Sequence, residues 1–139
     1  MTEIRDVAEV LGVKQPKTPV DLVVTIEHGL PLKSLTRLSG LLAPSDNAFK
    51  YRVVPKASLA RRRQGNRLSS SESALVARLA GIWALAVRIW QSEEDARDFL
   101  NRPHQLLGGR RPIELAIANE LGARLVEDIL GRIQSGVAV

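Results

Sequence analysis

The residues that could carry out a reaction are few in this chain and are poorly placed for one. There is no cysteine, and the only two histidines, His28 and His104, lie far apart, which excludes thiol chemistry and disfavours a histidine-rich metal site. Four acids, Glu93, Glu94, Asp95 and Asp98, cluster where a helix should begin, and carboxylates stabilise a helix N-terminus without any reaction. We therefore expect a protein that is not an enzyme and that needs no cofactor and no metal.

Positive charge is concentrated in one part of the sequence. No acid occurs between Lys50 and Arg67, while the basic residues there are Lys50, Arg52, Lys56, Arg61, Arg62, Arg63 and Arg67. Residues 1–67 hold twelve Lys and Arg against six acids, and residues 68–139 hold eight against nine. Such a block is typical of a surface that binds phosphates, although a solvated basic face is the alternative. The contrast predicts two domains, 1–68 and 69–139.

Two short helices are expected inside the basic block, at about 45–52 and 55–63. Ser45 suits an N-cap and Pro55 a first helical turn. Together they would form a helix-turn-helix, whose second helix enters the major groove of DNA with Val54 and Leu59 facing inward. The predicted DNA contacts are Lys56, Ala57, Ser58, Arg61, Arg62, Arg63 and Arg67. Val53 stands where such a turn often needs glycine and would be strained at positive φ, so a purely structural hairpin is the alternative.

Helical periodicity dominates the rest of the chain, and no strand pattern is sustained, so the fold should be all-α. Further helices are expected at about 3–11, 19–28, 31–42, 71–90, 93–100 and 113–118, with a final helix that carries Leu121, Leu125, Ile129 and Ile133 at intervals of four residues. Expected N-terminal caps are Thr18, Ser69, with Glu72 completing a capping box, and Ser92.

The stretch from Ala74 to Trp90 is apolar nearly all round. Arg78 and Arg88 leave about nine residues between them, against the roughly 20 that a membrane span needs. We therefore expect a core helix or half of an interface and no membrane association. The polar N-terminus lacks the pattern of a signal peptide, which favours a cytoplasmic protein.

Two C-terminal segments remain open to more than one interpretation. The segment from Leu107 to Pro112 lacks the glycine spacing of a phosphate-binding loop and favours a tight turn between helices. The apolar tail from Val137 to Val139 either binds a partner or folds back on its own helix.

From Gly29 to Val139 the sequence resembles antitoxins of the Xre/MbcA/ParS type, the partners of RES-domain toxins in type II toxin–antitoxin systems. The likeness in the N-terminal half rests on Gly29–Pro31, Val54–Arg62 and Leu68-Ser69. It is strongest in the C-terminal half, in the segments Ala96–Leu100, Leu107–Leu115 and Gly122–Ile133.

This resemblance implies an N-terminal Xre-like helix-turn-helix bundle that binds the operon's own promoter, followed by a helical toxin-binding domain. RES toxins act on NAD, so the last helix and tail would block the toxin's NAD cleft sterically. The implied toxin-binding residues are Leu107, Gly108, Gly109, Arg110, Arg111, Pro112, Arg132, Ile133, Gly136, Val137, Ala138 and Val139.

The implied partners are a cognate RES-domain toxin, operator DNA and a second copy of the chain, in a homodimer or in a toxin–antitoxin hetero-oligomer. The alternative is a stand-alone helix-turn-helix regulator whose C-terminal half only dimerises.

Overall fold

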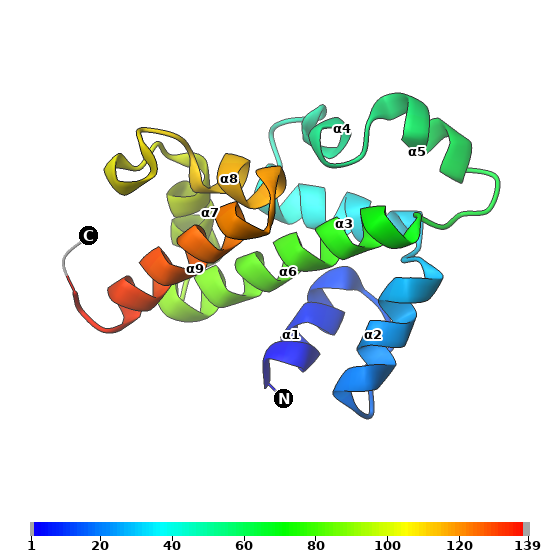
Figure 1. The fold of residues 1–139 in the computed structure, drawn as a ribbon, viewed down its shortest axis with the longest axis horizontal. Coiled ribbons are helices and arrows are strands. Elements are labelled where there is room, and N and C mark those ends of the chain that lie inside the picture. The colour runs from blue at the N-terminus through cyan, green and yellow to red at the C-terminus, as the bar shows by residue number, and fades with distance from the viewer. Residues whose placement is uncertain (1, 138–139) are drawn as a thin grey trace. The chain divides into compact units, whose positions relative to one another are not determined.

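The computed structural model describes residues 2–137, and over that range the chain is built from helices, which confirms the predicted all-α class (Figure 1). The helices are α1 (Thr2–Leu11), α2 (Pro19–His28), α3 (Leu32–Leu42), α4 (Phe49–Val53), α5 (Lys56–Arg62), α6 (Ser70–Trp90), α7 (Glu93–Asn101), α8 (Pro112–Ala118) and α9 (Glu120–Gln134), with a short 3-10 helix at Gln105–Leu107. Two isolated β-bridges join Pro31 to Arg67 and His104 to Arg110.

The chain divides into two compact units after Gly81, inside α6. This boundary lies later than the one expected at Leu68 from the charge contrast. Ser73 shows why, because its buried hydroxyl accepts a hydrogen bond of 2.8 Å from the backbone N–H of Leu30. The first turns of α6 are therefore part of the N-terminal unit.

In the first unit, α3 caps the C-terminus of α1. The last carbonyls of a helix have no partners within it and must find them elsewhere. The buried Ser34 hydroxyl donates to the carbonyl of Leu11 at 2.7 Å, and the Arg37 guanidinium donates to those of Glu9, at 3.0 Å, and Val10, at 3.3 Å. These contacts fix α1 against α3.

Helix α2 begins and ends at the predicted residues. The Thr18 hydroxyl accepts from the N–H of Asp21, and the Asp21 carboxylate accepts from the N–H of Thr18, which completes a capping box with Pro19 at the first helical position. At the other end Gly29 has φ +101°, and a Cβ there would collide with the carbonyl oxygen of Leu68. Only glycine therefore fits this close approach.

Helix α4 begins later than predicted. The expectation placed its start near Ser45, but the residues before Phe49 form a turn around Asp46. The Asp46 carboxylate accepts from the N–H of Ala48 at 2.9 Å, and its carbonyl accepts from the N–H of Phe49 at 3.2 Å. This local alternative to helical bonding is typical of aspartate and explains the difference.

The second unit is organised by a close contact between α8 and α9. Asn119 caps α9 by accepting from the N–H of Gly122 at 2.9 Å. Gly122 lies against the backbone of Leu115 in α8, where a Cβ would overlap the carbonyl oxygen. The predicted cap of α7 is confirmed as well, since the Ser92 hydroxyl accepts from the N–H of Asp95 at 3.1 Å.

By length and composition alone, helix α6 is long and apolar enough to cross a membrane. The expectation that Arg78 and Arg88 exclude a membrane span on these grounds is therefore wrong. A helix in the core of a protein can have the same length and composition. Core residues of α6 are Val76, Leu79 and Ala80 in the first unit and Ile82, Trp83 and Ala86 in the second, all of them buried.

The two glycines of α9 predict opposite stability effects. Gly122→Ala should lower the free energy of unfolding of the second unit by about 2 kcal/mol or more, because the new methyl has no space beside Leu115. Gly131→Ala should raise it by about 0.5–1 kcal/mol, since nothing lies within 4 Å of the added Cβ and alanine favours helix. Urea unfolding followed by tryptophan fluorescence measures both, because Trp83 and Trp90 belong to this unit. Equal effects of the two substitutions would contradict the proposed close contact.

Candidate interfaces for nucleic acid and protein

The turn between α4 and α5 needs no glycine. Val54 is extended at φ −128° and Pro55 has φ −52°, and the positive φ angles of non-glycine residues among residues 2–137 occur at Asn66 and Gln91. Val53 is therefore unstrained, and the turn is of a different kind from the one that requires glycine. Val54 and Leu59 are buried, as predicted for the inward face of a helix-turn-helix.

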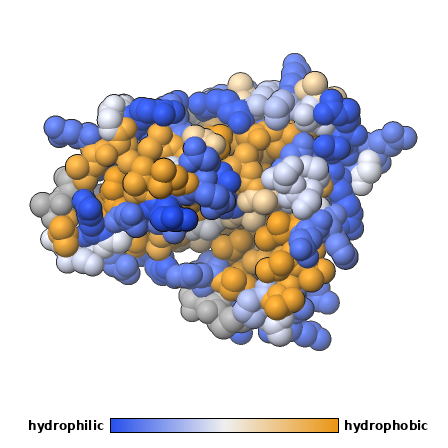
Figure 2. All heavy atoms as spheres, in the orientation of Figure 1, coloured by the Kyte–Doolittle hydropathy of each residue, from blue (hydrophilic) through white to orange (hydrophobic). Residues whose placement is uncertain are grey.

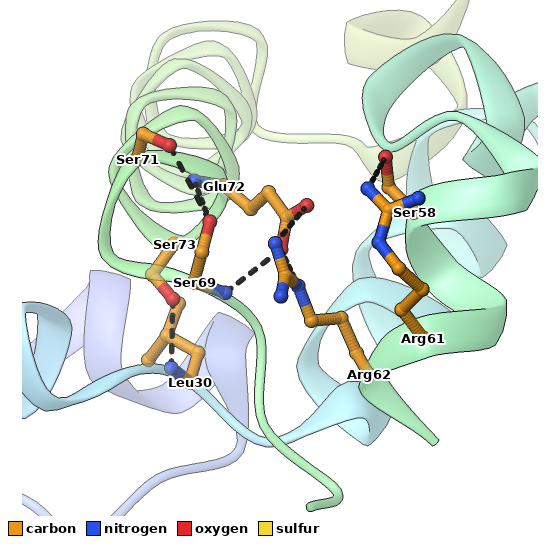
Figure 3. Close-up of polar contacts among 8 residues, drawn as sticks. All are labelled: Leu30, Ser58, Arg61, Arg62, Ser69, Ser71, Glu72 and Ser73. Atoms are coloured by element: carbon orange, nitrogen blue, oxygen red, sulfur yellow. Dashed lines mark hydrogen bonds and ion pairs between the residues drawn. The ribbon is translucent and has the colours of Figure 1, made fainter. Parts of the chain in front are cut away.

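Helix α5 presents most of its predicted DNA contacts to solvent. Lys56 and Ala57 in its first turn are exposed, as are Arg61 and, directly after the helix, Arg63. Ser58 is half-buried, and its hydroxyl accepts a hydrogen bond of 3.2 Å from the Arg61 guanidinium (Figure 3).

Arg62 has a different role from its neighbours. Its Nε lies 2.9 Å from Oε1 of Glu72 in an ion pair between α5 and α6 (Figure 3). The same oxygen accepts from the N–H of Ser69 at 2.7 Å, and the N–H of Glu72 donates to the Ser69 hydroxyl at 3.1 Å. The predicted capping box is thus confirmed, and Arg62 joins it to α5.

The Glu72 carboxylate is stabilised in its ionised form. Burial raises its pKa, but hydrogen bonds from the Arg62 side chain and from Ser69, with the positive charge of Arg62, outweigh burial and hold the pKa below the ordinary value. The negative charge is therefore retained where it can anchor Arg62 and cap α6.

Arg67 and Arg52 also make contacts within the first unit. The Arg67 guanidinium donates to the carbonyl of Gly29 at 3.2 Å, and that of Arg52 lies 2.8 Å from the carboxylate of Asp46. Both side chains remain exposed enough to meet solvent ions.

Tyr51 adds an aromatic ring to this basic surface. The ammonium groups of Lys50 and Lys56 lie 5.3 Å and 5.6 Å from its ring centroid, within the range of cation–π attraction. Sequence reasoning did not single out Tyr51, although it is the chain's one tyrosine and stands inside the basic block.

In the second unit, the segment from Leu107 to Pro112 is a tight turn. The N–H of His104 donates to the carbonyl of Arg110 at 3.1 Å, and Gly108 and Gly109 have positive φ. Leu107 and Pro112 are buried, whereas Gly108, Gly109 and Arg110 are exposed. Only part of this predicted toxin-binding segment is therefore accessible.

Arg111 is held at the start of α8. Its Nε lies 2.6 Å from Oε1 of Glu114, one turn along the helix. Hydrogen bonding from Arg111 is the main reason that the pKa of Glu114 lies below its ordinary value. Both side chains are about one-third exposed, so the pair lies at the surface.

Helix α9 does not bury the whole apolar stripe that its spacing suggested. Ile129 is buried and Ile133 half-buried, but Leu121 is 61% exposed and Leu125 41% exposed. Val126 and Leu130, one position further along, are the buried residues instead. Apolar side chains accordingly reach the surface over α9 in Figure 2.

Further exposed residues occur at the end of α9 and near the tight turn. The predicted contacts Arg132, Gly136 and Val137 are exposed, and Leu106 near the tight turn is exposed as well. Ala138 and Val139, also predicted contacts, lie outside the described residues. Leu106, Leu121 and Leu125 were missed because their sequence pattern cannot be distinguished from that of core residues.

A pocket of about 550 Å³ lies at the same end of the second unit. Its apolar lining comes from Trp90, Phe99, Ile133 and Val137, and Asp95 and Asp98 line it as well. The Trp90 and Phe99 rings are 6.0 Å apart. No cluster of three or more His, Cys, Asp or Glu suited to a metal is found among residues 2–137.

The fold and these surfaces together define a helical protein with a helix-turn-helix in one unit and a separate helical unit with an exposed apolar surface. A family model described as the antitoxin Xre-like helix-turn-helix domain matches residues 21–81, and one described as the antitoxin Xre/MbcA/ParS C-terminal toxin-binding domain matches residues 85–136. The chain belongs to this family of antitoxins and is an antitoxin of the type II class. No curated protein matches it significantly.

The Glu72 contacts predict a stability that depends on pH. Because its folded pKa is lowered, Glu72 should stabilise the first unit at pH values above the ordinary 4.5, and this contribution should be lost as the pH falls through the folded value. Glu72→Gln should cost about 1–3 kcal/mol at neutral pH and flatten the acid side of the profile.

Urea unfolding followed by circular dichroism at a series of pH values measures this effect. Arg62→Gln is the matched partner, because the double variant should cost less than the sum of the two single variants if the residues interact. An acid profile of Glu72→Gln that equals the unsubstituted one would contradict the assignment.

Proposed function

We propose that this antitoxin neutralises a RES-domain toxin by binding beside the toxin's NAD cleft and covering it, and that it represses its own operon by binding operator DNA. It would act in the cytoplasm, by binding and without catalysis, as a homodimer or within a toxin–antitoxin hetero-oligomer. The observation that carries the first part is the exposed apolar surface of the unit that matches the toxin-binding domain.

This surface, which we call the α9 surface, is formed by Leu121 and Leu125 of α9, both exposed. Leu121 and Leu125 are four residues apart and lie on one face of α9, and Arg132 follows on that face two turns later. Large exposed apolar groups beside polar ones are typical of protein-binding sites. A toxin that covers them would gain the free energy of their burial.

The support for steric blocking comes from the end of α9. The helix stops at Gln134, and Gly136, at φ +76°, turns the chain so that the N–H of Val137 donates to the carbonyl of Arg132 at 2.9 Å. The exposed Val137 thus follows directly on the α9 surface. A tail in this position would reach a cleft next to the bound helix.

The support for DNA binding comes from α5. Lys56 and Ala57 occupy its first turn, the part of a recognition helix that reaches base edges, and both are exposed. Arg61 and Arg63 follow as exposed cations that can contact phosphates. Arg62, by contrast, is engaged with Glu72 and serves to hold α5 in place.

The rival function is a stand-alone regulator whose C-terminal half only dimerises. It would use the same α5 but would have no toxin. An adjacent gene for a RES-type protein, and co-purification with its product, are expected for the antitoxin and not for the rival.

Substitutions on the α9 surface should abolish neutralisation. Leu121→Asp with Leu125→Asp should prevent co-purification with the neighbouring RES-domain protein and remove growth protection, because two charges would be buried in the interface. Ala118→Asp, which adds one charge to an exposed position of α8, is the control and should protect.

Deletion of residues 134–139 separates binding from blocking. The truncated chain should still bind the toxin through the α9 surface, while NAD consumption by the toxin continues in the complex. Full growth protection by the truncated chain would rule out tail insertion, and retained binding by the double aspartate variant would rule out the α9 surface.

For DNA binding, Arg61→Ala should weaken the affinity for the operon's own promoter fragment roughly tenfold and reduce the slope of log K against log salt concentration by about 1. Lys33→Ala removes an exposed cation of α3 outside the basic block and serves as the control. Gel shifts at several salt concentrations measure both. Equal binding by the two variants would reject α5 as the recognition helix.

A further inference from the structure

Helix α2 carries an apolar face that the first unit leaves uncovered. Val20 is 65% exposed, Val23 52% and Val24 41%, and Leu22 is the buried residue of this helix. Figure 2 shows apolar side chains gathered over α2, at the lower right. None of the proposed contacts with toxin or DNA involves this face.

The three valines share one face because they are spaced three and four residues apart. Valine is a poor helix former, and an exposed valine gives the helix no packing energy in return. Glu27 lies on the same face one turn beyond Val23 and Val24, and Lys17 stands just before the cap of the helix. Both charged side chains are exposed.

We propose that this face, Val20, Val23 and Val24 with Lys17 and Glu27, is the surface through which two copies of the chain pair, with the two α2 helices antiparallel. The proposal specifies the surface of the homodimer named above and rests on that part of the proposed function. The occupant is a second copy because the face is complementary to itself.

The charges decide between the two possible directions. In an antiparallel pair related by a two-fold axis near Leu22, Val20 of one copy faces Val24 of the other, and Lys17 faces Glu27 of the other. Two identical ion pairs then flank the valines. In a parallel pair Glu27 would face Glu27 and Lys17 would face Lys17, which is repulsive.

The seam is short, because α2 has ten residues and spans about 15 Å. An interface of this length is small compared with that of a permanent dimer. The dimer should therefore dissociate on dilution, and its dissociation constant can be measured directly.

Charge reversal tests the pairing. Lys17→Glu and Glu27→Lys should each raise the dissociation constant of the dimer about tenfold, because each turns two attractive contacts into repulsive ones. The double variant Lys17→Glu/Glu27→Lys restores opposite charges and should return the constant close to the original. Sedimentation equilibrium of the full chain over a wide concentration range measures all four proteins.

A second variant tests the valines. Val23→Asp should make the chain monomeric, whereas Val137→Asp, at a similarly exposed valine of the second unit, should leave the dimer intact. Circular dichroism and thermal unfolding establish that each variant is folded. Both results together support the α2 seam.

Three results would overturn the proposal: a chain that is monomeric at every concentration, a Val23→Asp dimer of unchanged strength, or a double charge variant no stronger than the single ones. If Val23→Asp leaves self-association unchanged and abolishes toxin binding, the toxin is the occupant of this face. Growth protection by the unsubstituted chain distinguishes these outcomes from a failure of the antitoxin function itself.

Discussion

The first unit depends on one carboxylate, that of Glu72. It caps the N-terminus of α6 through Ser69 and at the same time forms the ion pair with Arg62 of α5. The interaction is worth more than an ordinary surface pair because Glu72 is largely buried, with 14% of its side chain exposed. Loss of this charge would remove the partner of Arg62 and that of the Ser69 N–H at the same time. The capping of α6 and the position of α5 therefore depend on the same side chain.

A second constraint lies beside the first, where the segment after α2 meets the segment before α6. Gly29 allows the backbones to approach, the N–H of Leu68 donates to the carbonyl of Leu30 at 2.8 Å, and the buried Ser73 hydroxyl accepts from the N–H of Leu30. These polar groups would be costly if they were buried alone, but here each satisfies another. The resulting crossing holds the two ends of the helix-turn-helix region together although they are far apart in sequence.

Features set by local chemistry could be predicted from the sequence, and features set by tertiary contact could not. The caps at Thr18, Ser69 and Ser92 were predictable because each cap is a hydrogen bond between residues three apart. The start of α4 was not, since Asp46 offered a competing turn. Periodicity identified α9 as amphipathic but did not show which apolar residues are buried, and Leu121 and Leu125 face solvent because Gly122, Ala123 and Val126 form the contact face. Arg62 resembled its basic neighbours in sequence, and only the fold shows its partner.

The count of basic residues overstates the charge that the α5 region can offer to phosphates. Of the seven between Lys50 and Arg67, three are engaged within the unit: Arg52 with Asp46, Arg62 with Glu72 and Arg67 with the carbonyl of Gly29. Two of those contacts neutralise a charge, so binding a phosphate there requires breaking an ion pair or sharing its cation. The other four basic residues, which can contact phosphates without breaking an ion pair of this kind, are Lys50, Lys56, Arg61 and Arg63. Because each phosphate contact releases its own counterions, the salt dependence of DNA binding should follow this smaller set and not the net charge of the chain.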